Sequence, residues 1–96
     1  MRKDEIINVL HKFKDECAER YGILALGIFG SVARDEMGEN SDVDVVIRLQ
    51  KPELFMLAGI KTDLEERLHR PVDIVTYREA MNQFLKKRID RDVVYV

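Results

Sequence analysis

Short apolar runs that alternate with helical patterns constrain the fold of this chain more than any other feature. Three runs are apolar enough to be strands, over residues 23–29, 42–49 and 72–76. Turn residues and apolar residues at helical spacing predict helices over residues 4–20, 31–37, 52–70 and 78–88, with a short last strand at 93–96. This alternation predicts an α/β (α+β) fold, a mixed sheet of about four strands with helices packed on it.

The apolar positions of the helices predict part of the core. In the first and third helices they are Ile6, Ile7, Leu10, Phe13, Cys17, Leu54, Leu57, Ala58, Leu64 and Leu68. Gly22 is expected to end the first helix, and Pro52 to open the third, which Pro71 closes. A turn is expected at residues 38–40.

Length and charge narrow the function. The 96 residues are expected to form one domain, residues 1–96. We expect no membrane span, because no apolar stretch approaches ~18 residues, and no signal peptide, because the chain begins with charged residues. The single cysteine fits a reducing cytoplasm. A net charge of −2 argues against general nucleic-acid binding, and the basic residues 86–88 are interpreted as a solvated helix face.

Carboxylates mark the predicted strands. Asp42 and Asp44 lie two residues apart, so on an extended chain they leave the same face, roughly 7 Å apart, and can converge on a hard cation. Asp73 interrupts another apolar run, where a charge is costly unless it is compensated. The alternatives are a solvated strand edge for the first two and, for Asp73, an ion pair with Arg34 or Arg48.

A Gly-Ser pair follows the first predicted strand. Gly30 lets the backbone approach a ligand closely, and free amides at a helix start attract phosphate oxygens, to which the Ser31 hydroxyl adds a donor. Arg34 is expected to contact a phosphate or to pair with an acid. The alternative is a tight strand-to-helix turn with Ser31 as its N-cap. Together, the turn and the acids predict a metal-dependent nucleotide site.

The combined motif is more specific than its parts. Gly30-Ser31, then Ser41-Asp42-x-Asp44, and later Asp73 resemble the nucleotidyltransferase superfamily shared with DNA polymerase β. The short chain and its end, residues 92–96, look like the minimal branch, the MNT-domain proteins. One departure is that an aspartate follows the motif arginine, where many members have glycine, which affects the local loop.

The resemblance implies a role for each motif residue. The nucleotide-binding residues would be Gly30, Ser31, Arg34 and Ser41. The catalytic residues, which would also hold a pair of Mg²⁺ ions, would be Asp42, Asp44 and Asp73. Attack would fall on the α-phosphate of ATP, transferring AMP and releasing pyrophosphate.

The resemblance also implies a partner. Minimal-branch proteins are often encoded beside a HEPN-domain ribonuclease, and they are similar to antitoxins that attach AMP to a tyrosine of that toxin. The core elements use up the chain, so the acceptor is expected to arrive on another protein, or on a second copy of this one in a homo-oligomer. Two alternatives stay open: an antitoxin that neutralises its partner by binding alone, and an adenylyltransferase of the type that modifies aminoglycosides.

Overall fold

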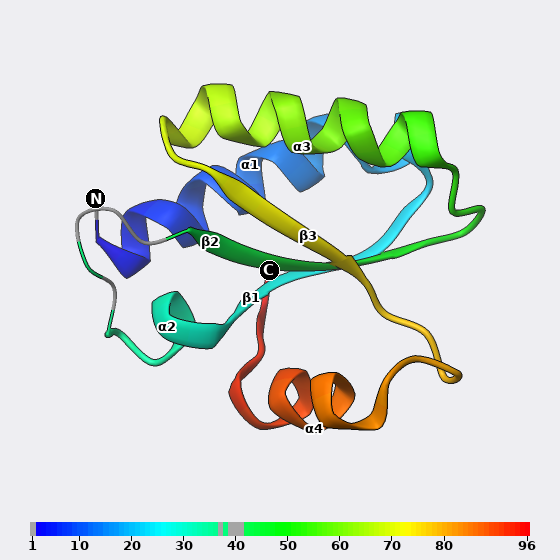
Figure 1. The fold of residues 1–96 in the computed structure, drawn as a ribbon. Coiled ribbons are helices and arrows are strands. Elements are labelled where there is room, and N and C mark those ends of the chain that lie inside the picture. The colour runs from blue at the N-terminus through cyan, green and yellow to red at the C-terminus, as the bar shows by residue number, and fades with distance from the viewer. Residues whose placement is uncertain (1, 37, 39–41) are drawn as a thin grey trace.

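A mixed β-sheet forms the centre of the molecule. The computed structural model describes residues 2–36, 38 and 42–96 (Figure 1). Within them, four strands form one sheet in the order β3-β2-β1-β4, with bounds Ile23–Phe29 (β1), Val43–Leu49 (β2), Val72–Thr76 (β3) and Val94–Tyr95 (β4). β1 is antiparallel to β2 and β4, whereas β2 and β3 are parallel. The predicted α+β fold with a mixed sheet is confirmed.

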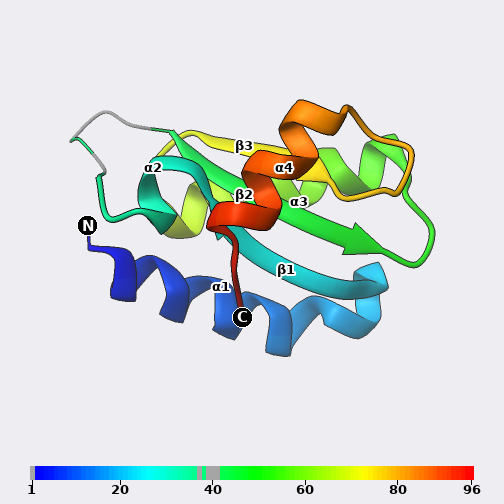
Figure 2. The ribbon, with the colours of Figure 1, turned by 90° about the horizontal axis from the view of Figure 1, so that it is seen from below.

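Helices connect and cover the strands. Their bounds are Lys3–Tyr21 (α1), Gly30–Ala33 (α2), Leu54–Leu68 (α3) and Gln83–Asp92 (α4). Because parallel strands need a crossover connection, α3 joins β2 to β3. α1 and α3 lie on one face of the sheet and α4 lies on the other, as the two views in Figures 1 and 2 show. We call these the α1/α3 face and the α4 face.

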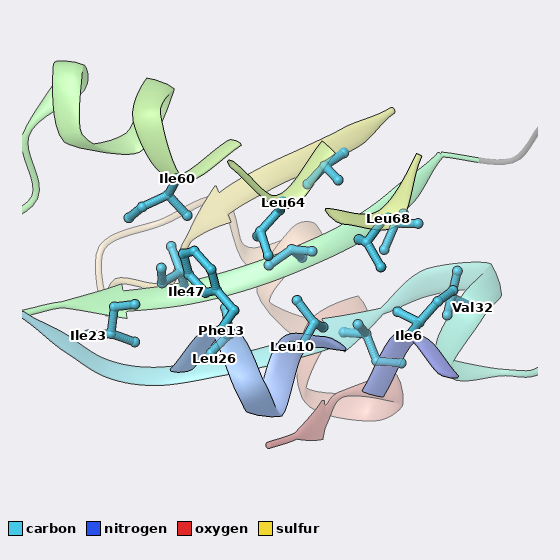
Figure 3. Packing of buried hydrophobic residues seen from close by; sticks show 14 of the residues in the cluster. Ile6, Leu10, Phe13, Ile23, Leu26, Val32, Ile47, Ile60, Leu64 and Leu68 are labelled. Atoms are coloured by element: carbon cyan, nitrogen blue, oxygen red, sulfur yellow. The ribbon is translucent and has the colours of Figure 1, made fainter. Parts of the chain in front are cut away.

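The main hydrophobic core lies on the α1/α3 face. Alternate residues of β2, beginning with Val43 and Val45, point into it, as the period of a strand requires. Figure 3 shows this packing between the sheet and the two helices. The fully buried residues that it labels include Ile6, Leu10, Phe13, Leu26, Ile47, Ile60 and Leu64. The predicted core residues Cys17 and Leu68 are buried there too.

The α4 face has a much smaller core. Its buried members are Phe29, Val46 and Ile89, each from a different element. Partly buried side chains surround them, namely Val75, Tyr77, Met81, Leu85 and Val93. α4 therefore covers part of this face with one short apolar stripe.

Several predicted boundaries were wrong for local reasons. α2 covers Gly30–Ala33 rather than residues 31–37, because Asp35 takes a left-handed conformation with φ 61° that a helix cannot continue. Ser31 lies inside α2, so its predicted role as the N-cap was wrong: the N-cap is Phe29. Residue 37 and most of the expected turn at 38–40 fall outside the described residues.

The later helices were shifted in the prediction. α4 covers Gln83–Asp92 rather than residues 78–88, because the Asn82 side chain accepts hydrogen bonds from the amides of Phe84 and Leu85 and so caps the helix start. α3 begins at Leu54, two residues after Pro52. Gly22 ends α1 with φ 66°, as predicted.

Two predicted core positions of α3 are exposed. Leu54 has 77% of its surface exposed, and Ala58 is exposed as well. The buried stripe of α3 runs instead through Ile60, Leu64 and Leu68, at a spacing of four residues. In the part of the chain that the structure describes, no helix combines the length and the apolarity that a membrane crossing requires.

Candidate active site

The end of β1 meets the start of β2 at a glycine. Gly30 follows β1 with φ 71°, a left-handed conformation that side chains other than glycine rarely adopt. A Cβ atom at this position would collide with Oδ2 of Asp44. The carboxylate of Asp44 therefore lies directly against the backbone of the Gly-Ser turn, and only glycine leaves room for it.

Strand register brings Asp44 beside Asp73. Asp44 pairs with Phe29 of β1 on one side and with Asp73 of β3 on the other. Neighbouring strands lie about 4.8 Å apart, so two paired residues present side chains next to each other on one face. Val43 and Val45 point to the α1/α3 face, which places Asp44 on the α4 face.

The charges of three carboxylates interact at this end of the sheet. The pKa of Asp44 is raised, first by partial burial of its carboxyl group and then by the negative charge of Asp73. The charge of Asp42, which is exposed just before β2, raises it further. The structure thus pairs Asp44 with Asp73 and leaves Asp42 near enough for its charge to act on Asp44, a repulsion that a bound cation would relieve.

The prediction that Asp73 is buried was wrong. Its side chain is exposed, because Val72 and Ile74 pack toward α3 and leave Asp73 on the opposite face of an edge strand. Asp44 on the neighbouring strand is the half-buried member of the three acids. Position within the sheet, rather than the apolar neighbours in sequence, decides which acid is buried.

Arg34 pairs with acids, one of its two expected roles. Its guanidinium contacts Asp92 at the end of α4 (Nη1 to Oδ2, 2.8 Å) and Glu36 (Nε to Oε2, 3.1 Å). Arg34 thus pairs with these two acids and not with Asp73, its possible partner in the sequence analysis. Arg34 still lies near enough to Asp44 for its positive charge to lower the pKa of that carboxyl group.

The remaining predicted nucleotide-binding residues are two serines. Ser31 is the second residue of α2 and is half-buried, directly after the glycine that contacts Asp44. Ser41 lies outside the described residues.

The donor set has the chemistry that Mg²⁺ prefers, since all three acids offer hard oxygen ligands. Among the described residues, however, no group of three His, Cys, Asp or Glu side chains is already arranged to hold a metal ion. Three carboxylates that repel one another are expected to stay apart until a cation draws them in. The carboxylate oxygens therefore fit Mg²⁺ in chemical type, and a bound ion would draw the three side chains toward one another.

The sequence analysis missed Arg88 and Asp92. Arg88 had been grouped with Lys86 and Lys87 as a solvated helix face, but its positive charge lowers the pKa of Asp44 from the neighbouring α4. Asp92 holds both Arg34 and Arg91. The signal that could have found them is their spacing of four residues, which puts both on one side of a helix.

Comparison with known proteins finds similar sequences over most of the chain. Residues 10–96 match the nucleotidyltransferase domain family. The chain is 37% identical to a Methanocaldococcus jannaschii protein that carries the name of a protein adenylyltransferase, over 96% of this chain and 95% of that one. It is 35% identical to the protein adenylyltransferase MntA of Thermococcus cleftensis, over 97% of this chain and 94% of that one.

Solved structures share the fold. A structure described as a minimal nucleotidyltransferase superposes with a TM-score of 0.81 at 29% identity, covering 98% of this chain and 95% of that one. A toxin–antitoxin structure with AMP-PNP gives a TM-score of 0.72 at 18% identity, over 99% of this chain and 72% of that one. The MNT antitoxin complex of a tri-AMPylated Shewanella oneidensis HEPN toxin gives 0.62 at 16%, over 97% and 66%.

Proposed function

Because this chain belongs to the nucleotidyltransferase domain family, we propose that it transfers AMP from ATP to a protein and so silences a HEPN-type toxin. The family match over residues 10–96 and the relatives of about equal length make the chain a nucleotidyltransferase. The nucleotide, the metal and the acceptor are the proposed parts.

The position of Asp44 carries the proposal. It is flanked by Asp73 on the next strand, and its carboxylate touches the backbone of the Gly-Ser turn. An acid placed between a second acid and a glycine turn can serve both a metal-bound phosphate and the incoming nucleophile. A merely solvated acidic edge would not require a glycine against one of its carboxylates.

The proposed reaction is an in-line displacement at the α-phosphate of ATP. The acceptor hydroxyl oxygen forms a bond to the α-phosphorus, and the bond from that phosphorus to the bridging oxygen of pyrophosphate breaks. The hydroxyl proton passes to Asp73, whose exposure makes it accessible to a second protein. AMP then remains on the acceptor, and pyrophosphate leaves.

Asp42, Asp44 and Asp73 would hold the Mg²⁺ ions. Bound there, Mg²⁺ would offset the charge of the phosphates and orient them for attack. The protein's own contribution is positioning: β2 and β3 fix two of the acids side by side, and Gly30 lets the first approach the turn.

The nucleotide would bind along the turn after β1. Gly30 and Ser31 are proposed to contact the triphosphate, together with Ser41, for which the motif is the support. Arg34 is proposed to join them while it stays paired with Asp92, because a guanidinium has five N–H donors and these ion pairs use only some of them.

A tyrosine of a HEPN toxin is the proposed acceptor. Two relatives of nearly the same length carry names of protein adenylyltransferases. A structural neighbour is an MNT antitoxin bound to an AMPylated HEPN toxin. Transfer to such a partner requires that the acceptor oxygen be held close to the acids, which protein–protein docking would provide.

The test is a transfer assay with the partner encoded beside this protein. The wild type, Asp44→Asn and the control Asp15→Asn are each incubated with α-labelled ATP, Mg²⁺ and the partner. Asp15 is an exposed carboxylate of α1 that contacts only His11 among the ion pairs of the described residues, so its loss should not matter. Label should appear on the partner with the wild type and the control, and disappear with Asp44→Asn.

The outcome also separates the alternatives. If Asp44→Asn folds, fails to transfer label and still neutralises the partner, the protein is an antitoxin that acts by binding alone. If an aminoglycoside is added to the same reaction, label found only on that small molecule would favour the aminoglycoside-modifying alternative. Absence of labelling with the wild type would refute the proposed transfer.

A further inference from the structure

One side of α4 faces the candidate active site. Leu85, Arg88, Ile89 and Asp92 follow one another at helical spacing, so they lie on the same side of the helix. Leu85 and Ile89 pack on the small core of the α4 face, and Asp92 pairs with Arg34 at the end of α2. Figure 2 shows α4 crossing the sheet with its last turn near α2. Arg88 is therefore at the margin of this core, on the side of the carboxylates.

Among the described residues, Arg88 is the arginine of α4 that forms no ion pair. Lys86 pairs with Glu79, and Arg91 pairs with Asp92. Across the described ranges, Arg88 takes part in no ion pair or side-chain hydrogen bond. The next residue, Ile89, is buried against Phe29, which pairs with Asp44 in the sheet. An exposed guanidinium thus lies beside the small core that borders Asp44.

We propose that Arg88 binds phosphate oxygens of the nucleotide and is a substrate-binding residue of this active site. The inference rests on the proposed function. A triphosphate that enters among carboxylates needs positive charge beyond that of the metal, and a guanidinium can hold phosphate through parallel hydrogen bonds. Arg34 already donates hydrogen bonds to Asp92 and Glu36, whereas among the described residues no acid occupies the donors of Arg88.

Calorimetric titration with ATP and Mg²⁺ tests this role in four proteins: the wild type, Arg88→Ala, Arg88→Lys and Lys87→Ala. Lys87 is the matched control, since it is an exposed cation on the same helix, one residue away and turned to another side. Thermal unfolding followed by circular dichroism checks that each variant folds.

Arg88→Ala should weaken ATP binding by about tenfold to a hundredfold, the range expected for losing a hydrogen bond to a charged group. Arg88→Lys should fall in between, because lysine keeps the charge but not the paired donors. Lys87→Ala should bind as the wild type does.

Two results would overturn the inference alone: ATP affinity unchanged in Arg88→Ala, which would make Arg88 a counter-ion of Asp44 only, or an equal loss in Lys87→Ala, which would indicate a general charge effect. If the wild type itself did not bind ATP, the proposed function would fail as well.

Discussion

The two faces of the sheet differ in what they are built from. The α1/α3 face is covered by two long helices and holds the large core, in which Phe13 and Leu64 are fully buried. The α4 face has one ten-residue helix, and its core among the described residues has the buried members Phe29, Val46 and Ile89. Asp44 and Asp73 lie on this second face, at the end that the apolar stripe of α4 leaves open.

This division separates stability from chemistry. Most of the buried apolar residues lie on the α1/α3 face, so the α4 face can accommodate like charges that repel each other. An acidic site under a large apolar core would have to be desolvated and would lose access to substrate. Substitutions on the two faces should therefore have different effects.

The largest expected effect is on stability from the α1/α3 face. Leu64→Ala should lower the free energy of unfolding by about 2–5 kcal/mol, the usual cost of such a cavity. Ile89→Ala removes a residue that is equally buried but lies in the small core, so its cost should be near the lower end, about 2 kcal/mol. Urea denaturation measures both. A greater loss for Ile89→Ala would contradict the contrast between the faces.

Asp44→Asn, on the α4 face, should lower activity without lowering stability. Transfer activity should fall by about 10²–10³-fold, the range seen when one electrostatic contact to a transition state is removed. The pKa of Asp44 is raised, by burial first and by Asp73 next, so the ionised carboxylate costs the folded state stability relative to the unfolded chain at neutral pH. The melting temperature of Asp44→Asn should therefore equal or exceed that of the wild type.

A marked drop in melting temperature for Asp44→Asn would show instead that this carboxylate stabilises the fold. Thermal unfolding in a buffer without divalent cations is the decisive condition, because a bound metal would stabilise the wild type alone.

Glycine substitutions sharpen the same contrast. Gly30→Ala should destabilise the protein by about 1–2 kcal/mol through its left-handed conformation. It should also abolish transfer, since the new Cβ collides with Asp44. Gly59→Ala on α3 is the matched control: a Cβ there meets nothing, and alanine in a helix should stabilise by about 0.4–1 kcal/mol. Equal effects of the two changes on unfolding would refute the interpretation.

The smallest effect concerns the acid stability of the α4 face. Hydrogen bonds from Arg91, and then from Arg34, lower the pKa of Asp92 from 3.8 to about 2. A lowered carboxyl pKa stabilises the folded state above the unfolded pKa, and that contribution is lost as the pH falls toward the folded pKa. The melting temperatures of wild type and Asp92→Asn should therefore differ at neutral pH and converge between about pH 4 and pH 2. A gap that persists at the acid end would contradict this origin.

The sequence predicted the elements of the fold better than their ends. Apolar runs and helical spacing located every strand and helix of the described residues, because burial on one face imposes those periods. The start of α4 was missed because the Asn82 side chain caps the helix later than the pattern indicates. The end of α2 was missed because Asp35 adopts a left-handed conformation that its identity does not dictate.

The sequence predicted which residues belong to the candidate site better than it predicted how they are arranged in space. Strand pairing puts Asp44 beside Asp73, and the roles of Asp42, Asp44 and Asp73 stay predictions. The expectation that Asp73 is buried was wrong because its strand lies at the edge of the sheet. Arg88 was overlooked because its position depends on which side of α4 meets the sheet. Those are properties of tertiary packing, which local patterns do not encode.

The parallel pairing of β2 and β3 makes the candidate site depend on contacts between segments far apart in the sequence. Asp44 and Asp73 become neighbours only after the intervening helix α3 has docked and the crossover has closed. A nascent or partly unfolded chain thus has the same acids but no juxtaposed pair of them. The proposed chemistry is thereby tied to the docking of α3 on the sheet, so a change far from the acids that loosens α3 would also separate them.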